Sequence, residues 1–200
     1  MRNFFLACFC IVLAGCTSVG NSDADARRID FSNDWCFQLG DEPAAMAPDY
    51  DDSAWRKLNL PHDWAIEGDF SPHNPSGTGG GALPGGIGWY RKTFTPDVNA
   101  SDKRLYIDFD GAYMNATVYI NGHELGTRPY GYISFSYDLT PYIQWGKPNV
   151  VAVRVDNAEQ PNSRWYSGCG IYRHVWLRNL HPVHVAQWGT YVTTPQVSEE

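Results

Sequence analysis

Two short segments carry side chains that could bind a ligand rich in hydroxyl groups. His62-Asp63-Trp64 places an aromatic ring beside a carboxylate that can accept two hydroxyl hydrogen bonds. Asn162-Ser163-Arg164-Trp165 adds an amide, the donor fork of a guanidinium group and a second ring. Aromatic planes can stack on the C–H faces of pyranose rings, so a sugar is one ligand that would fit, and packing of the rings in a β-sandwich core is the alternative. The structural alternatives are an Asx-type turn at Asp63 and an ordinary surface or ion-pair role for Arg164.

Composition narrows the class of partner. Of the 200 residues, 43% are hydrophobic and 14% aromatic, which is enough for a packed core and argues against disorder. The formal net charge is -7 and no run of Lys or Arg occurs, which argues against a nucleic-acid partner because a phosphate-binding face needs a basic excess. The six His are scattered and no metal-ligand spacing such as CxxC occurs, so we predict neither a metal site nor a cofactor.

Three further patterns have explanations other than catalysis. His123 follows Asn121-Gly122, a dipeptide typical of tight hairpin turns, so turn formation alone accounts for it. The letters GTGGGA at 77–82, within a long glycine-rich loop over 65–88, match a dinucleotide fingerprint, but the following Leu-Pro-Gly-Gly cannot begin the helix that the fingerprint requires. The acidic stretch 49–52 lacks the spacing of a calcium loop and predicts a solvated turn.

The amino terminus indicates export. Residues 1–15 combine an early Arg with an apolar stretch too short to span a bilayer, which is typical of a secretory signal. The ending Leu-Ala-Gly-Cys resembles a bacterial lipobox, which implies a lipid on Cys16 and a flexible tether over 16–28; a plain signal peptide is the alternative. We therefore expect a lipid-anchored protein of the bacterial cell envelope. Cys36 and Cys169 remain, either as a disulfide or as two free thiols.

Strand patterns dominate the rest of the chain. Residues 89–94, 105–110, 116–120, 150–155 and 174–177 read as strands, and apolar and polar residues alternate in 105–110. Many short strands separated by turn residues predict an all-β, two-sheet sandwich of the jelly-roll or galactose-binding-like type. After Pro182 a new strand pattern begins at 183–185 and 189–194. We interpret 182–200 as the truncated start of a second β domain; a last strand of the first sandwich is the alternative.

An ordered set of motifs over 29–181 resembles the sugar-binding domain of glycoside hydrolase family 2, with the closest likeness to β-galactosidases. The motifs are DDSAW (51–55) with LPHDW (60–64), GWYRKTF (88–94), FDGAY (109–113), VYINGH (118–123), GYISF (131–135) and SRWYSGCGIYR (163–173). The resemblance implies that the jelly roll is followed by an immunoglobulin-like domain and a TIM barrel, on which it packs. It also implies a retaining mechanism with two barrel glutamates about 5–5.5 Å apart.

A barrel needs about 250 residues, more than this chain can supply, so we expect no catalytic residue here. The resemblance implies that the chain shapes a subsite for an oligosaccharide or glycan through Asp63, Trp64, Asn162, Arg164 and Trp165. The carboxylate that some members carry near Ser163 is missing. The alternative function is a stand-alone carbohydrate-binding lipoprotein without hydrolase activity.

For several residues of these motifs we predict structural roles instead of ligand binding. Gly168 and Gly170 suit a sharp turn, and Arg173 suits a buried ion pair. Three further tryptophans are assigned to packing: Trp35, Trp55 and Trp89.

Overall fold

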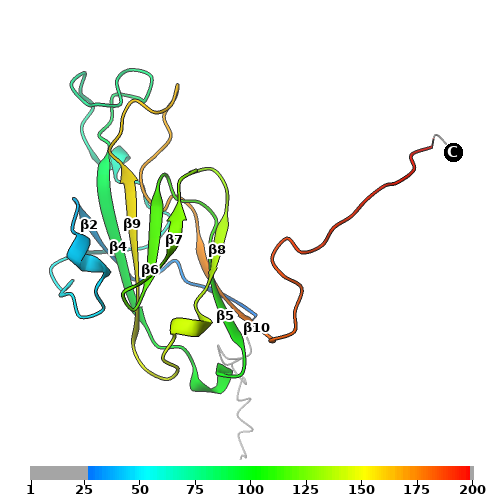
Figure 1. Ribbon diagram of the computed structural model, residues 1–200. Coiled ribbons are helices and arrows are strands. Elements are labelled where there is room, and N and C mark those ends of the chain that lie inside the picture. The colour runs from blue at the N-terminus through cyan, green and yellow to red at the C-terminus, as the bar shows by residue number, and fades with distance from the viewer. Residues whose placement is uncertain (1–26, 199–200) are drawn as a thin grey trace, which may run out of the picture.

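The computed structural model describes residues 27–198 and folds them into two antiparallel sheets packed face to face (Figure 1). The four-stranded sheet has the order β1-β10-β5-β8, and the six-stranded sheet has the order β3-β2-β4-β9-β6-β7. The strands are β1 Arg28–Asp30, β2 Trp35–Leu39, β3 Arg56–Leu58, β4 Gly86–Phe94, β5 Arg104–Phe109, β6 Ala116–Ile120, β7 His123–Arg128, β8 Phe135–Asp138, β9 Asn149–Asn157 and β10 Val175–Leu180. The predicted all-β sandwich is confirmed.

Helical structure within residues 27–198 consists of short 3-10 turns. They are η1 Pro43–Met46, η2 Ala65–Glu67, η3 Val98–Ala100 and η4 Thr140–Tyr142. In this part of the chain, no helix has the length and apolar character needed to cross a membrane.

Side-chain alternation along the strands forms the core. In β5, Leu105, Ile107 and Phe109 are buried between the sheets, as the sequence predicts. In β9, Val151, Val153 and Val155 do the same and are fully buried. The intervening residues of each strand therefore face outward from the sandwich.

The hairpin between β6 and β7 follows from its turn residues. Asn121 has φ 49° and Gly122 has φ 82°, and Ile120 pairs with His123 directly across the turn. Positive φ at both central residues is what a type I′ turn requires, and Asn-Gly adopts it at low cost. The predicted hairpin, with His123 in a structural position, is confirmed.

The outer face of the six-stranded sheet is covered by the chain's own segment 40–55 (Figure 1). Trp55 and Ala45 from this segment pack on Trp89 of β4, and both tryptophans are buried. Arg91 anchors the segment: it is 1% exposed, and its Nε donates to Asp52 Oδ2 at 2.8 Å. The packing roles predicted for Trp55 and Trp89 are confirmed, as is that of the buried Trp35. Asp52 is an ion-pair partner instead of a solvated turn residue.

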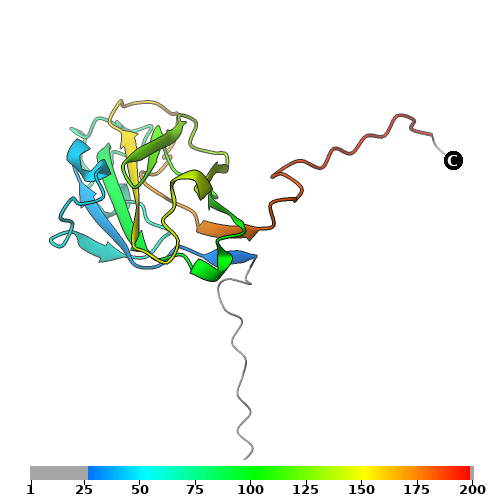
Figure 2. The same cartoon turned by 60° about the horizontal axis from the view of Figure 1, so that its bottom comes forward.

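The segment after β10 forms no strand within residues 181–198; it contacts the four-stranded sheet through His184 and Gln187 and then extends away from the sandwich (Figure 2). The strands predicted at 183–185 and 189–194 are therefore not formed, because strands need a hydrogen-bonded partner and none lies beside them in the described chain. The start of a second domain at residue 182 stays a prediction. The signal peptide, the lipid on Cys16 and the tether up to residue 26 lie outside the described residues.

Candidate functional site

The two sequence segments singled out for ligand binding meet at one end of the sandwich, where β4 begins and β9 ends (Figure 1). The backbone N–H of Trp64 donates to the Cys169 carbonyl oxygen at 3.1 Å. The backbone N–H of His62 donates to the Ile171 carbonyl oxygen at 2.9 Å. These bonds place the 62–64 segment directly beside the 163–173 segment, so side chains from both can reach one ligand.

Asp63 fastens the two segments together. Its Oδ1 accepts hydrogen bonds from the backbone N–H groups of Ala65 at 3.0 Å and Cys169 at 2.9 Å. Its Oδ2 accepts a hydrogen bond from the Tyr166 hydroxyl. The bond to Ala65 forms the Asx-type turn that the sequence offered as the structural alternative. Asp63 is half-buried, and its main contacts in this chain position the neighbouring segment.

Two glycines allow this close approach. Gly168 has φ 81° and Gly170 has φ 119°, which side-chain-bearing residues rarely adopt. A Cβ at Gly170 would also lie 2.8 Å from the His62 carbonyl oxygen, so backbone space excludes it. The turn-forming role predicted for both glycines is confirmed.

A buried hydrogen-bonded pair, His62 and Tyr90, positions the 62–64 segment. The Tyr90 hydroxyl lies 2.7 Å from His62 Nδ1, and Arg56 Nη2 lies 2.7 Å from His62 Nε2. Because Arg56 can only donate, its contact assigns Nε2 as the acceptor and Nδ1–H as the donor to Tyr90, and the 3.3 Å approach of Glu67 Oε1 to Nε2 is then an electrostatic contact. Burial lowers the pKa of His62, an effect that the nearby Glu67 carboxylate opposes.

Arg164 and Trp165 are free to meet a ligand. Arg164 is exposed, and within residues 27–198 its side chain forms no hydrogen bond or ion pair. Trp165 is 60% exposed, and its Nε1–H donates to the Tyr132 hydroxyl at 3.2 Å. An unpaired guanidinium group beside an open, oriented ring can donate to hydroxyls while the ring stacks. The structure thus brings these two predicted residues together at the surface.

Two other predicted site residues have structural roles. Trp64 is 3% exposed and stacks on Phe37, with 5.9 Å between ring centroids, so it offers no face to a sugar. Asn162 uses its amide within the loop: Nδ2 donates to Asn157 Oδ1 at 2.7 Å, and Oδ1 accepts from the Tyr113 hydroxyl at 3.2 Å. In this chain Trp64 is therefore a packing residue, whereas Asn162 is exposed and its role in binding stays a prediction.

Arg173 also differs from its prediction. It is exposed instead of buried, and it forms no ion pair with a residue of the described chain. The buried ion pair expected there is wrong.

Sequence reasoning missed a group of exposed tyrosines around Trp165. Tyr130 is 56% exposed, Tyr132 is 42% exposed and Tyr166 is 40% exposed. The rings of Tyr130 and Tyr132 meet edge to face at 5.6 Å. The sequence signal for two of them is Tyr-Gly-Tyr at 130–132, which places two rings on either side of a glycine in the turn before β8. Together with Trp165 they form an aromatic surface at this end of the sandwich.

The hollow between the glycine-rich loop and the 157–169 segment is too small for a sugar. Its lining includes Leu83, Pro84, Tyr166 and Gly168, and the space that water-sized spheres can occupy is about 20 Å³. This corresponds to about one water molecule. A sugar that contacts Arg164 and the exposed rings would lie on an open surface, and a second wall would have to come from elsewhere.

Comparison with known proteins identifies the fold and its family. The sequence model described as "Glycosyl hydrolases family 2, sugar binding domain" matches residues 82–181, half of the chain. The chain belongs to glycosyl hydrolase family 2. It is 64% identical over 186 residues to the β-galactosidase BoGH2A of Bacteroides ovatus, and 45% identical over 200 residues to a putative β-glucuronidase of Formosa agariphila. These matches cover 93% and 100% of this chain.

The chain spans 22% of that β-galactosidase and 19% of that β-glucuronidase. Solved structures of family 2 show the same proportion. A family 2 member from Bacteroides cellulosilyticus superposes with a TM-score of 0.81 and 42% identity over 86% of this chain and 23% of its own. A β-glycosidase from Bacteroides vulgatus superposes with a TM-score of 0.78 and 49% identity over 80% of this chain and 21% of its own. The sandwich is thus the sugar-binding domain of much longer family 2 proteins.

Proposed function

We propose that this chain is the amino-terminal carbohydrate-binding part of a retaining glycoside hydrolase of the β-galactosidase type. It supplies substrate contacts, and the two catalytic glutamates lie in a TIM barrel encoded beyond residue 200. The observation that carries this proposal is the meeting of the 62–64 and 163–173 segments, which presents the unpaired Arg164 and the exposed Trp165 at one surface.

The relatives support this proposal in two ways. Their names describe enzymes that act on β-galactosides or β-glucuronides, and they are about four and about five times as long as this chain. The 64% identity to the β-galactosidase favours a β-galactoside as the substrate. Since Arg164 and Trp165 are exposed and the hollow beside Trp165 is too small for a sugar, we assign the choice of sugar to residues of the barrel.

Three side chains have different roles at the surface proposed to bind the sugar. Arg164 donates hydrogen bonds to sugar hydroxyls, and Trp165 stacks on the apolar face of the ring. Asp63 holds the loop that carries them and has oxygen lone pairs left to accept a sugar hydroxyl. Hydrolysis itself then requires the acid/base and nucleophile pair of the retaining mechanism.

Kinetics of the full-length gene product test the proposal. We expect Arg164→Ala to lower kcat/KM for an aryl β-galactoside by roughly 10- to 100-fold, the equivalent of lost charge-assisted hydrogen bonds. We expect Trp165→Ala to lower it about tenfold through lost stacking. Arg104→Ala is the matched control, an exposed arginine of β5, and should leave kcat/KM unchanged. If Arg164→Ala and Trp165→Ala match the control at unchanged thermal stability, the domain only supports the barrel.

Calorimetry on the 200-residue chain distinguishes the stand-alone binding function. An open surface with one wall buries little of a sugar, so we expect galactoside binding that is about millimolar or too weak to detect. Micromolar binding by this chain alone, abolished by Trp165→Ala, would favour the stand-alone carbohydrate-binding lipoprotein.

We also propose that the protein is exported and held in the bacterial cell envelope by a lipid on Cys16. The support is the sequence alone: an apolar leader ending in Leu-Ala-Gly-Cys. Mass spectrometry of the mature protein should find a diacylglyceryl modification on Cys16, and Cys16→Ala should release the protein from the membrane fraction. An unmodified amino terminus created elsewhere would contradict the anchor.

A further inference from the structure

The two residues proposed to meet a sugar differ in how firmly the chain holds them. Arg164 forms no hydrogen bond or ion pair within residues 27–198. Trp165 is also exposed, but its indole N–H is bonded to the Tyr132 hydroxyl. This bond restrains a ring that would otherwise change rotamer as quickly as exposed side chains usually do. The orientation of the Trp165 ring therefore depends on what holds the Tyr132 hydroxyl.

Three hydrogen bonds form a closed cycle around Trp165. Its Nε1–H donates to the Tyr132 hydroxyl oxygen at 3.2 Å. The Tyr132 hydroxyl donates to Ser167 Oγ at 3.2 Å, and the Ser167 hydroxyl donates to the Trp165 carbonyl oxygen at 3.3 Å. Because an indole N–H can only donate, the direction of the first bond is fixed, and each hydroxyl has one proton for the next bond. The cycle therefore joins the ring of Trp165 to its own backbone.

Tyr132 can act as a fixed point because its segment, residues 129–134 between β7 and β8, is itself held in place. The Tyr172 hydroxyl donates to the Gly131 carbonyl oxygen at 2.8 Å. A Cβ at Gly131 would overlap the Tyr113 ring, so the segment approaches this ring as closely as only glycine permits. The Tyr132 ring meets the Tyr113 ring edge to face, with 5.3 Å between the centroids. The Tyr132 side chain is thus positioned by its ring as well as by its hydroxyl.

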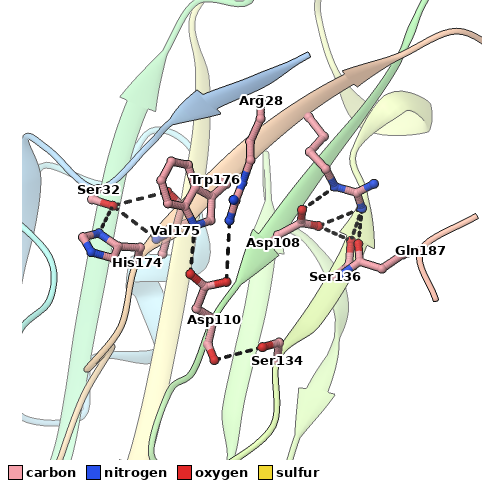
Figure 3. Close-up of polar contacts among 11 residues, drawn as sticks. Arg28, Ser32, Asp108, Asp110, Ser134, Ser136, His174, Val175, Trp176 and Gln187 are labelled. Atoms are coloured by element: carbon pink, nitrogen blue, oxygen red, sulfur yellow. Dashed lines mark hydrogen bonds and ion pairs between the residues drawn. The ribbon is translucent and has the colours of Figure 1, made fainter. Parts of the chain in front are cut away.

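The carboxyl end of the same segment is anchored to the four-stranded sheet. The Ser134 hydroxyl donates to the Asp110 carbonyl oxygen at 3.1 Å, directly after β5 (Figure 3). Two sequence motifs, FDGAY at 109–113 and GYISF at 131–135, meet through this bond. The proposed function uses neither motif directly. Their contacts hold the backbone from which Tyr132 reaches Trp165.

A ring that is already ordered binds a ligand more tightly than one that must be ordered on binding. Immobilising a side chain when a ligand arrives reduces affinity, and a ring fixed beforehand avoids that loss. The bond to Tyr132 uses the polar edge of the Trp165 indole, and Trp165 is still 60% exposed, so apolar ring surface is left for stacking. The neighbouring Tyr130 hydroxyl, in contrast, forms no hydrogen bond within residues 27–198. Position 132 is therefore distinguished from position 130 by its contact with the indole.

We propose that Tyr132 is a positioning residue, which fixes the Trp165 ring through the hydrogen-bond cycle in the orientation that stacks on a sugar. This role rests on the proposed sugar binding by Trp165. Tyr132 acts through the indole N–H and does not itself contact the sugar. The surface is then built from three segments that are distant in the sequence: 62–64, 129–134 and 163–173.

Exchange of the indole N–H with solvent measures the fixed ring directly, in the 200-residue chain and without a sugar. In a ¹⁵N–¹H spectrum, the Trp165 signal is the indole signal that Trp165→Phe lacks. We expect Tyr132→Phe, which keeps the ring and removes the hydroxyl, to speed this exchange roughly 3- to 10-fold, the effect of losing one neutral hydrogen bond. Ser167→Ala interrupts the same cycle at another member and should change the rate in the same direction.

Tyr142→Phe is the matched control for Tyr132→Phe. Tyr142 is 39% exposed and Tyr132 is 42% exposed, and the Tyr142 hydroxyl forms no hydrogen bond within the described residues 27–198. Its ring stacks on His123 and not on the 163–173 segment. An unchanged Trp165 exchange rate in Tyr132→Phe, or an equal acceleration in Tyr142→Phe, would overturn the proposal.

Kinetics of the full-length gene product test the consequence for binding. Tyr132→Phe should lower kcat/KM for an aryl β-galactoside roughly 3- to 10-fold, mainly through a higher KM, because a less ordered ring weakens binding without affecting the reacting atoms. In the Trp165→Phe background the same substitution should have no further effect, since phenylalanine has no N–H to hold. Equal effects of Tyr132→Phe in both backgrounds would indicate a direct contact of its hydroxyl with the sugar and overturn the positioning role.

Two combined outcomes separate the role of Tyr132 from the proposed function. If Trp165→Ala leaves kcat/KM unchanged while Tyr132→Phe still speeds exchange, the cycle exists but the surface binds no sugar. The proposed function then fails, and the role of Tyr132 in binding fails with it. If Trp165→Ala lowers kcat/KM while Tyr132→Phe has the same kcat/KM as Tyr142→Phe, the proposed function stands and the positioning role is overturned.

Discussion

Asp63→Ala tests whether one carboxylate holds the two site segments together. The substitution removes two hydrogen bonds from backbone N–H groups and one from the Tyr166 hydroxyl. A hydrogen bond to a charged group contributes about 1.5–3 kcal/mol when buried and less when exposed. Since Asp63 is half-buried, we expect the free energy of unfolding to fall by about 3 kcal/mol. Asp63→Asn keeps the Oδ1 acceptor, so we expect it to cost about 1 kcal/mol.

Urea unfolding followed by tryptophan fluorescence measures these changes, provided that the denaturant slope stays constant. Asp51→Ala is the matched control, because the Asp51 carboxylate accepts only a local hydrogen bond from Ser53 N–H, and its stability should match that of the parent chain. A double-mutant cycle of Asp63→Asn with Tyr166→Phe isolates the contact between the segments. The reasoning fails if Asp63→Ala is as stable as Asp51→Ala, or if the cycle shows no coupling.

Three further predictions concern groups away from the ligand surface. Arg91→Met should lower the free energy of unfolding by about 3 kcal/mol in urea titrations, because it leaves Asp52 and the carbonyls of segment 40–55 without their hydrogen-bond donor. An unchanged free energy of unfolding would contradict the anchoring role of Arg91. Burial lowers the pKa of His62 in the folded state, so as pH falls the unfolded state binds a proton before the folded state does. The free energy of unfolding should therefore fall as pH drops below about 6.5. Denaturation measured at pH 5 and pH 7 should show that His62→Gln removes this part of the pH dependence. Burial raises the pKa of the Cys169 thiol to about 12, so iodoacetamide should modify Cys36 well before Cys169 in peptide-level mass spectrometry. The reverse order would refute the assignment of Cys169 as the less reactive, buried thiol.

The fold was predictable where the turn residues and the alternation of apolar and polar residues indicate the same strand or hairpin. The alternation at 105–110, the valines of β9 and the Asn-Gly turn each specify their strand or hairpin through short-range geometry. The cover over the six-stranded sheet was not predictable in this way. This cover depends on Arg91, and an arginine in a strand sequence does not indicate that its partners lie about 40 residues earlier in the chain. Long-range pairing of this kind is set by the packed structure and leaves no periodic signal.

The site was predictable in residue type but less so in role. Arg164 and Trp165 are exposed where a ligand can reach them, as the sequence suggests. Trp64 and Asn162 occupy similar polar, aromatic surroundings in the sequence, yet one ring packs on Phe37 and the amide is used within its own loop. Sequence spacing gives the direction of a side chain in a strand but not in a loop. Loop residues therefore need coordinates before a binding role can be separated from a structural one.

The first and last strands of the sandwich are neighbours, since Arg28 of β1 pairs with Arg178 of β10. The chain therefore enters and leaves the domain side by side, at the end of the sandwich away from the loops that precede β4 and follow β9 (Figure 1). If the proposed lipid anchor and the proposed downstream domains pulled on the two ends of this domain, the force would act first where β10 pairs with β1 and β5. The ladders of β4 and β9 belong to the other sheet, so the surface that carries Arg164 and Trp165 lies outside the strands that such a force would load.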